Sequence, residues 1–233
     1  IEIQVIGDGK DKYLFFPARD CTLQRKHQKI IEETPSAFIG AKLERTLQQA
    51  AIQIAQAAEL RGLATIEFLV DENQQYYFLE VNPRIQVEHG ITELLTGVDL
   101  VREQLNLAFG GKLNLEQKEL KAKGWVIECR LTAENPWDSF APSAGTVTNY
   151  RIPTGPGIRV DDGIYNGQEV SIYFDSLLAK IMVYAKTRTE AIAKMQNALG
   201  EILLDGIVTN QNLLQNLLQS KEFNSCQHTT GFV

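Results

Sequence analysis

An alternation of polar and apolar residues over residues 80–88 constrains this chain more than any other feature. Successive side chains of an extended chain point to opposite faces, so the pattern predicts a strand with a row of functional groups on one face. A solvated strand face alternates in the same way. Two carboxylates, a guanidinium and two amides in one row are more typical of a binding site. The polar positions are Glu80, Asn82, Arg84, Gln86 and Glu88.

The residues before this row predict the first strand of a hairpin. Residues 63–70 are rich in β-branched and aromatic side chains, residues 71–75 are polar, and residues 76–79 are aromatic again. Such an order is typical of two antiparallel strands joined by a turn. With the turn centred between Asn73 and Gln74, the two strands would continue into the alternating row.

This register would place Glu67 directly opposite Glu80. Like charges that face each other on neighbouring strands are destabilising, so we expect a proton or a cation between them. Two carboxylates and the Asn82 amide oxygen are hard ligands, which suit Mg²⁺ or Mn²⁺ held together with phosphate groups. The alternative is a slipped register that leaves Glu67 as an ordinary surface residue.

Composition excludes several classes of protein. The chain has 233 residues, of which 44% are hydrophobic and 22% are charged, as in globular proteins. A net charge of −6 argues against a general nucleic-acid binder, and no apolar run approaches the ~20 residues of a membrane helix. The three cysteines are widely separated, which favours a reducing compartment. We expect the cytoplasm, and a mitochondrial origin stays open because the chain starts inside a strand without methionine.

The order of elements predicts an α+β fold with two domains. Helix-patterned segments alternate with short β-rich segments, and a charged stretch at residues 112–123 lacks β character. We expect one domain over residues 1–112, another over residues 120–233, and a connection between them. The helix-patterned segments are residues 41–60, 91–109, 190–204 and 210–218. The strands of the second part are expected at 125–132, 146–152, 157–160 and 168–172, and residues 177–184 are a further apolar run.

A basic segment follows Arg19-Asp20-Cys21. Residues 25–29 read Arg-Lys-His-Gln-Lys, a cluster that can bind phosphate or another small anion. A solvated basic loop would have the same composition, so the cluster alone leaves both interpretations open.

Taken together, these motifs resemble the biotin carboxylase family, the ATP-grasp component of acetyl-CoA, propionyl-CoA, pyruvate and urea carboxylases. The resemblance extends over residues 1–233. The motifs that carry it are R-D-C-x-x-Q-R-x-H-Q-K at residues 19–29, Glu67, E-V-N-P-R-I-Q-V-E-H at residues 80–89, E-C-R at residues 128–130, F-A-P-S at residues 140–143, D-S at residues 175–176 and D-G-I-V-T-N at residues 205–210.

The resemblance implies a fold and a two-step reaction. Residues 1–112 would form the C-terminal lobe of an ATP-grasp domain, an antiparallel sheet with helices, and residues 120–233 the biotin carboxylase C-terminal domain. ATP would activate bicarbonate as carboxyphosphate, and N1 of biotin on a carrier protein would capture its CO₂. The implied cofactors and substrates are ATP, two Mg²⁺ or Mn²⁺ ions, bicarbonate and biotin. The implied partners are a biotin carboxyl carrier protein or domain, a carboxyltransferase and a second copy in a homodimer.

The resemblance also implies roles for single residues. Glu67 and Glu80 match metal-binding carboxylates that also contact the nucleotide, with Asn82 close to the metal. Gln24 and His27 match nucleotide contacts. The bicarbonate and biotin pocket would be formed by Lys29, Arg84, Gln86, Val87, Glu88 and Arg130. Within it, Glu88 matches the general base, Arg84 and Lys29 hold the anion, and Arg130 stabilises the biotin enolate.

The chain departs from the family pattern at three positions and lacks some of its parts. Ala18 stands where the family usually has Glu, Gly90 where it has Pro, and Phe174 where it often has Tyr. The preATP-grasp domain, the glycine-rich lid and the histidine expected before Ile1 are missing from this sequence. Catalysis depends on positioning all parts together, so we expect the chain alone to be an inactive fragment.

Two other functions stay open on the sequence. One is an ATP-grasp ligase with carbamate chemistry, such as a carbamoyl-phosphate synthetase-like half. The other is a nucleotide-binding or assembly module without turnover. Arg130 and the run from Gln86 to His89 favour the biotin reaction over the first. The retention of every acid, base and anion-binding residue in this part of the enzyme argues against the second. The final carboxyl acceptor is not encoded in this chain.

Overall fold

The computed structural model describes residues 1–233, which form two compact units. Unit 1 comprises residues 1–21 and 32–126, and unit 2 comprises residues 22–31 and 127–233. The division does not follow chain order, because residues 22–31 leave unit 1 and belong to unit 2. The expected domain bounds, 1–112 and 120–233, stay a prediction.

Unit 1 is built on a four-stranded antiparallel sheet with the order β2-β1-β5-β6. Alternation along β1 and β5 gives the sheet two different faces. Its strands are β1 (Glu2–Asp8), β2 (Tyr13–Phe15), β5 (Arg61–Val70) and β6 (Tyr76–Asn82). Its helices are α1 (Ala41–Ala57), α2 (His89–Thr96), α3 (Leu100–Ala108) and a 3-10 helix (Gln117–Glu119).

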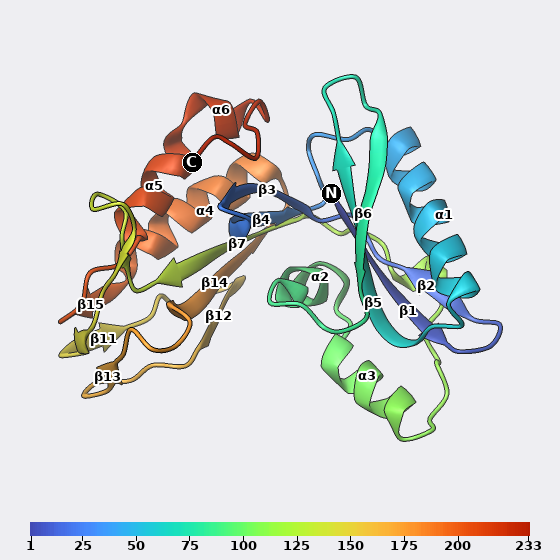
Figure 1. Ribbon diagram of the computed structural model, residues 1–233, viewed down its shortest axis with the longest axis horizontal. Coiled ribbons are helices and arrows are strands. Elements are labelled where there is room, and N and C mark those ends of the chain that lie inside the picture. Colours follow the sequence, from blue (N-terminus) through green and yellow to red (C-terminus); the bar gives the residue numbers. More distant parts are fainter. The chain divides into compact units, whose positions relative to one another are not determined.

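Helix α1 covers one face of this sheet with an apolar core. Ile3 and Val5 of β1 pack there with Ile66 and Phe68 of β5 and with Leu47 of α1. Figure 1 shows α1 on this face of the sheet, with α2 and α3 on the other. The hydrophobic effect of this burial therefore fixes which side chains of β1 and β5 are left for the opposite face.

The opposite face changes character along the strands. Near α3 it is apolar, with Ile6 and Leu63 in a core that includes Leu100 and Leu107. Further along the same face the positions are polar, and Thr65 and Glu67 of β5 lie two and four residues beyond Leu63. The alternation thus carries one strand face from a core into a cluster of functional groups.

Two helical predictions were too long. The segment expected as one helix over residues 91–109 is two helices, because Gly97 has φ 78° and ends α2, while Asp99 caps α3 by accepting from the backbone N–H of Arg102. Glycine adopts this left-handed conformation without steric cost, and Asp is a favoured N-cap. The segment expected over residues 41–60 ends at Ala57, and Glu59 is left-handed.

Most of a five-stranded sheet with the order β12-β14-β7-β4-β3 belongs to unit 2. Only the strand ends at residues 20–21, 32–34 and 125–126 are assigned to unit 1. The strands of the sheet are β3 (Asp20–Arg25), β4 (Gln28–Thr34), β7 (Trp125–Thr132), β12 (Ile158–Asp162) and β14 (Leu177–Ala185). Its helices are α4 (Arg188–Glu201), α5 (Gln211–Gln219) and α6 (Lys221–Asn224). Short ladders join β8 (Glu134–Asn135) to β9 (Ala141–Pro142), β10 (Gly145–Thr146) to β13 (Glu169–Val170), and β11 (Asn149–Arg151) to β15 (Leu203–Asp205).

Strands β3 and β4 were not anticipated by the sequence, which indicated only a polar segment there. They are joined at Lys26 and His27, whose φ values of 47° and 67° are both left-handed. Two consecutive left-handed residues are the signature of a two-residue hairpin turn, which usually carries Asn-Gly or Asp-Gly. No helix of either unit has the length and apolar character that crossing a bilayer requires.

Candidate functional site

The β5–β6 pair places Glu67 directly opposite Glu80, as the alternation predicted. Thr65 lies opposite Asn82 in the same register. Nearer the turn the register shifts by one residue at a β-bulge after Glu67, so that Phe68 lies opposite Phe78. The turn is therefore centred on Asn73 rather than between Asn73 and Gln74, and the bulge restores the predicted carboxylate pair.

Amide groups link the two carboxylates. The Asn82 side-chain nitrogen donates to Glu67 Oε1 at 2.9 Å and to Glu80 Oε1 at 2.8 Å. The Gln86 side-chain nitrogen donates to the same Glu67 oxygen at 2.8 Å. Arg84 Nη2 lies 3.4 Å from the amide oxygen of Asn82. Five of the sequence-predicted residues of unit 1 thus form one connected polar cluster: Glu67, Glu80, Asn82, Arg84 and Gln86.

This cluster fits a divalent cation. The carboxylates of Glu67 and Glu80 converge on the Asn82 amide, whose N–H groups partly compensate their negative charge. A cation bound between the carboxylates would compensate the same charge. Their oxygens are the hard ligands that Mg²⁺ and Mn²⁺ prefer. Asn82 points its nitrogen at both carboxylates here, so its oxygen would reach a cation only after the amide rotates.

The predicted row is not a continuous strand. Strand β6 ends at Asn82, and the expectation of an extended chain to Glu88 is wrong. Pro83 has no N–H to donate to a ladder, and the next N–H, that of Arg84, turns back to the carbonyl of Asn82 at 2.8 Å. Glu88 instead stands as the N-cap of α2, with φ −81° and ψ 7°.

The polar residues that follow the end of β6 differ in their exposure to solvent. Gln86 and Glu88 are buried, whereas Arg84 and Val87 are exposed. The Arg84 guanidinium also donates to the carbonyl of Ile85 at 3.1 Å. The anion-binding candidates therefore include two buried polar side chains and an accessible guanidinium on one short loop.

Arg19 is a buried residue for which the sequence suggested no role. Its side chain is 0% exposed, and its Nη2 atom lies 3.0 Å from Glu2 Oε2. Burial alone would lower the pKa of Arg19, but the negative charges of Glu2 and Glu88 outweigh burial and raise this pKa. Potential ligand atoms of Glu2, Cys21 and Glu88 lie within 4.8 Å of one another. Because the guanidinium already supplies positive charge there, we interpret this group as an ion-pair cluster.

The other predicted site residues lie in unit 2, around the β3–β4 hairpin and on β7. His27 is exposed at the hairpin turn, while Gln24 and Lys29 are partly exposed on the two strands. Arg25 of the basic segment is engaged within the unit, since its guanidinium stacks 3.9 Å from the Phe140 ring centre and donates to the Ser139 carbonyl. This contact joins the F-A-P-S motif to the basic segment.

The backbone around Arg130 is fixed by hydrogen bonds to the Asn210 side chain. The buried Asn210 side chain donates to the Arg130 carbonyl at 2.9 Å and accepts from the backbone N–H of Thr132 at 2.9 Å. This pair of bonds ties the D-G-I-V-T-N motif to strand β7. Gly206 of the motif has φ 98°, and a Cβ there would collide with the Thr146 carbonyl, so glycine is required.

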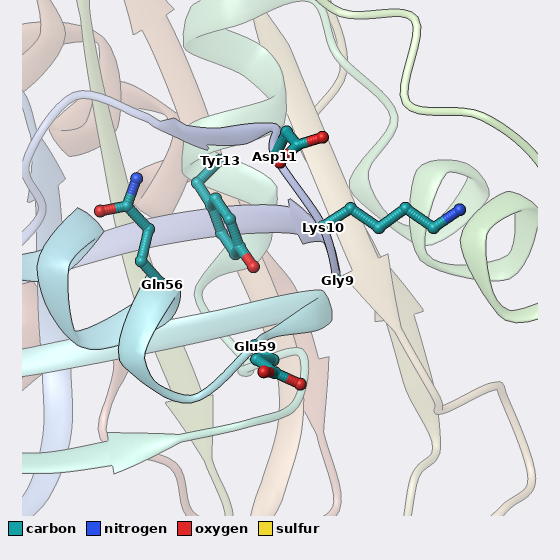
Figure 2. A pocket seen from close by; sticks show the side chains of 6 residues that line it. All are labelled: Gly9, Lys10, Asp11, Tyr13, Gln56 and Glu59. Atoms are coloured by element: carbon teal, nitrogen blue, oxygen red, sulfur yellow. The ribbon is translucent and has the colours of Figure 1, made fainter.

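A separate pocket of about 460 Å³ lies between the β1–β2 loop and the end of α1. Figure 2 shows the Tyr13 ring between Gln56 and this loop, with the Lys10 side chain extending away. Burial and the carboxylates of Asp8, Glu59 and Asp11 raise the pKa of Tyr13. None of the predicted site residues lines this pocket, which is lined by Gly9, Lys10, Asp11, Tyr13, Gln56 and Glu59.

The two halves of the chain match two different family models. Residues 1–116 match the family model described as carbamoyl-phosphate synthase L chain, ATP binding domain. Residues 128–233 match the biotin carboxylase C-terminal domain. The chain is 43% identical over its whole length to biotin carboxylase 1 of Bacillus subtilis, of which it covers 52%. It is 40% identical over its whole length to the mitochondrial propionyl-CoA carboxylase alpha chain of Homo sapiens, of which it covers 32%.

A solved structure has the same fold. The biotin carboxylase domain dimer of Hydrogenobacter thermophilus 2-oxoglutarate carboxylase, in complex with MgADP, ADP and bicarbonate, superimposes with a TM-score of 0.96 at 38% identity. The match covers 99% of this chain and 51% of that one. The mixed α+β fold expected from the sequence, with its antiparallel sheets and helices, is confirmed. The chain belongs to the biotin carboxylase family, and it spans about half the length of the bacterial biotin carboxylase it matches.

Proposed function

We propose that a protein containing this chain carboxylates N1 of biotin on a carrier protein, using ATP and bicarbonate. One observation carries the proposal: the Glu67–Glu80 pair is connected through the Gln86 amide to the loop that ends in the buried Glu88. A metal–phosphate site and an anion site would thereby be adjacent within one unit. Phosphoryl transfer to bicarbonate needs these two sites side by side.

In this reaction, residues of both units would bind bicarbonate, accept its proton and stabilise the biotin enolate. Arg84 presents a planar fork that can hold bicarbonate bidentately, and Lys29 contributes a point charge. Glu88 takes the proton from the bicarbonate oxygen, which makes that oxygen a better nucleophile. Arg130 supplies a positive charge where the biotin enolate forms.

The metal would be held by Glu67 and Glu80, with Asn82 next to it. When bound, the cation neutralises the charge that develops as the γ-phosphoryl group moves. Gln24 and His27 are proposed contacts of the nucleotide, and Val87 completes the anion pocket. The chain by itself is proposed to be inactive, because it carries only part of the ATP site.

The partners proposed are a biotin carboxyl carrier protein or domain, a carboxyltransferase and a second copy of the same protein. The matched Hydrogenobacter domain is described as a dimer, which supports the last of these. No disulfide joins the three cysteines, which supports a reducing compartment such as the cytoplasm. The matched human chain is described as mitochondrial, so that compartment is the alternative.

The test is an ATP-cleavage assay on a complete biotin carboxylase that contains this chain. We expect cleavage to require bicarbonate and to increase when biotin is added, with carboxybiotin as the product. Formation of carbamoyl phosphate with ammonia, and no response to biotin, would contradict the proposal. Nucleotide binding without any turnover would assign the chain to a non-catalytic module instead.

A further inference from the structure

We propose that Arg19 is a positioning residue that fixes the orientation of the Gln86 side-chain amide and so determines that an N–H group, and not an oxygen, faces the anion. This inference rests on the proposed function, because it concerns the same anion pocket. It adds a residue that does not itself touch bicarbonate and that has no role among the site residues named above.

Arg19 is surrounded by acceptors from separate parts of unit 1. Its guanidinium donates to Gln4 Oε1 at 2.9 Å, to Thr65 Oγ1 at 3.1 Å and to Thr92 Oγ1 at 3.2 Å. It also forms the ion pair with Glu2. Strands β1 and β5 and helix α2 therefore hold the guanidinium in one place, since moving it would leave several buried acceptors without their bonds.

The remaining bond of the guanidinium goes to Gln86. Arg19 Nη2 donates to Gln86 Oε1 at 2.8 Å, and Gln86 is only 6% exposed. A guanidinium has donors alone and an ionised carboxylate has acceptors alone. Gln86 lies between Arg19 and Glu67, so only one amide orientation satisfies both neighbours: oxygen toward Arg19 and nitrogen toward Glu67.

This orientation leaves a donor for an anion. The Gln86 amide nitrogen has two N–H groups, and one of them is used on Glu67. The other can donate to an anion beside it. A rotated amide would instead present its oxygen to the Glu67 carboxylate and to the anion, which is repulsive on both sides. Arg19 prevents this rotation because its guanidinium cannot accept a hydrogen bond.

A double-mutant cycle in a complete enzyme that contains this chain tests the inference. Arg19→Lys keeps the positive charge but lacks the planar fork, and Gln86→Met keeps the length but lacks the amide. We expect Arg19→Lys to raise KM for bicarbonate by about 10- to 100-fold, as for a lost buried hydrogen bond to a charged group. In the Gln86→Met background the same change should have an effect of no more than about twofold. KM for ATP should stay within about twofold in both backgrounds.

Thr92→Val is the matched control. It removes another bond of the same guanidinium, on helix α2, without touching Gln86. We expect it to lower the melting temperature while leaving KM for bicarbonate unchanged. If Arg19→Lys and Thr92→Val raise this KM equally, or if the effects of Arg19→Lys and Gln86→Met multiply, Arg19 acts on general stability and the inference is wrong.

A second measurement uses the 233-residue chain itself and does not depend on activity. The Gln86 side-chain N–H₂ resonances are identified by NMR as those that disappear in Gln86→Met. In the wild-type chain we expect them to exchange slowly with water and to show Overhauser contacts with the Asn82 side chain, which donates to the same Glu67 oxygen. In Arg19→Lys they should shift toward the values of an exposed glutamine.

The wild-type spectrum can overturn the inference even if Arg19→Lys does not fold. Overhauser contacts from the Gln86 N–H₂ protons to the Arg19 guanidinium protons in place of Asn82 would mean a rotated amide and would overturn it. Absence of bicarbonate-dependent ATP cleavage by the wild-type enzyme would instead reject the proposed function. The NMR result on Arg19 and Gln86 would stand in that case.

Discussion

Glu67 and Glu80 face each other across β5 and β6, and the side-chain nitrogen of Asn82 donates a hydrogen bond to both. The two acids need this donor because opposed carboxylates repel each other. A divalent cation would balance their charge more completely than a neutral amide does. If the proposed metal binds here, it would take over from the amide the task of balancing the two carboxylates.

Replacing either acid should weaken Mn²⁺ binding to the chain. We expect Glu67→Gln and Glu80→Gln each to lower the affinity by about tenfold or more, since even residues behind the ligands of a metal contribute 10- to 100-fold. Titration followed by electron paramagnetic resonance of free Mn²⁺ measures this. The exposed Glu72, in the turn of the same hairpin, is the control. Equal affinities for Glu67→Gln and Glu72→Gln would place the metal elsewhere.

Removing the basicity of Glu88 should block the first chemical step. In a complete enzyme containing this chain, Glu88→Gln keeps the size of the side chain but cannot take a proton. Bicarbonate-dependent ATP cleavage should fall by roughly 10² to 10⁴, the usual contribution of a general base. Nucleotide affinity, measured by equilibrium titration, should barely change. Normal turnover with a collapse of nucleotide binding would make Glu88 a structural or nucleotide residue.

Arg84 and Lys29 should differ in their effect on bicarbonate. Arg84→Ala removes a planar fork that orients the anion, whereas Lys29→Ala removes mainly charge. We therefore expect the larger loss of kcat/KM for bicarbonate with Arg84→Ala. Arg84→Lys should retain more activity than Arg84→Ala but less than the wild type, because it keeps the charge without the fork. Equal losses for the two alanine variants would show that orientation is not what Arg84 contributes.

In unit 2, Asp161 should make stability depend on pH. It lies opposite Lys180 in the β12–β14 register and pairs with Arg159 at 2.8 Å. Burial would raise the pKa of Asp161, but the bonds and charges of Arg159 and Lys180 outweigh it and lower this pKa from 3.8. A lowered pKa in the folded state means stability that is present above the unfolded value and lost as pH falls through the folded one.

Asp161→Asn should thus destabilise the chain by about 1 kcal/mol or less at pH 7, because the group is partly solvated. The difference in melting temperature between wild type and variant should shrink as the pH falls below 3.8. Asp138→Asn, at an exposed position, serves as the control. A difference that grows toward low pH would contradict the sign of this argument.

Much of the site was accessible to local reasoning. Strand alternation and the turn composition predicted that Glu67 and Glu80 would be paired, because register between neighbouring strands is a short-range property. The bulge after Glu67 was not visible, and the predicted pair came out right because the bulge and the true centre of the turn compensate. Pro83 indicated that β6 ends at Asn82. The alternation of polar and apolar residues continues regularly to Glu88, however, and it predicted a longer strand.

By itself, the sequence determined the resemblance to the family, the α+β class and the charged residues of the candidate site. These depend on residue types and on motifs that span only a few residues. Only the tertiary structure decided that Arg19 is buried among groups from β1, β5 and α2, and that residues 22–31 belong to unit 2. Contacts between residues far apart in the chain form only when a core has brought their strands together. A buried arginine and a solvated one have the same letter in the sequence, and they differ physically in the acceptors that the fold assembles around them.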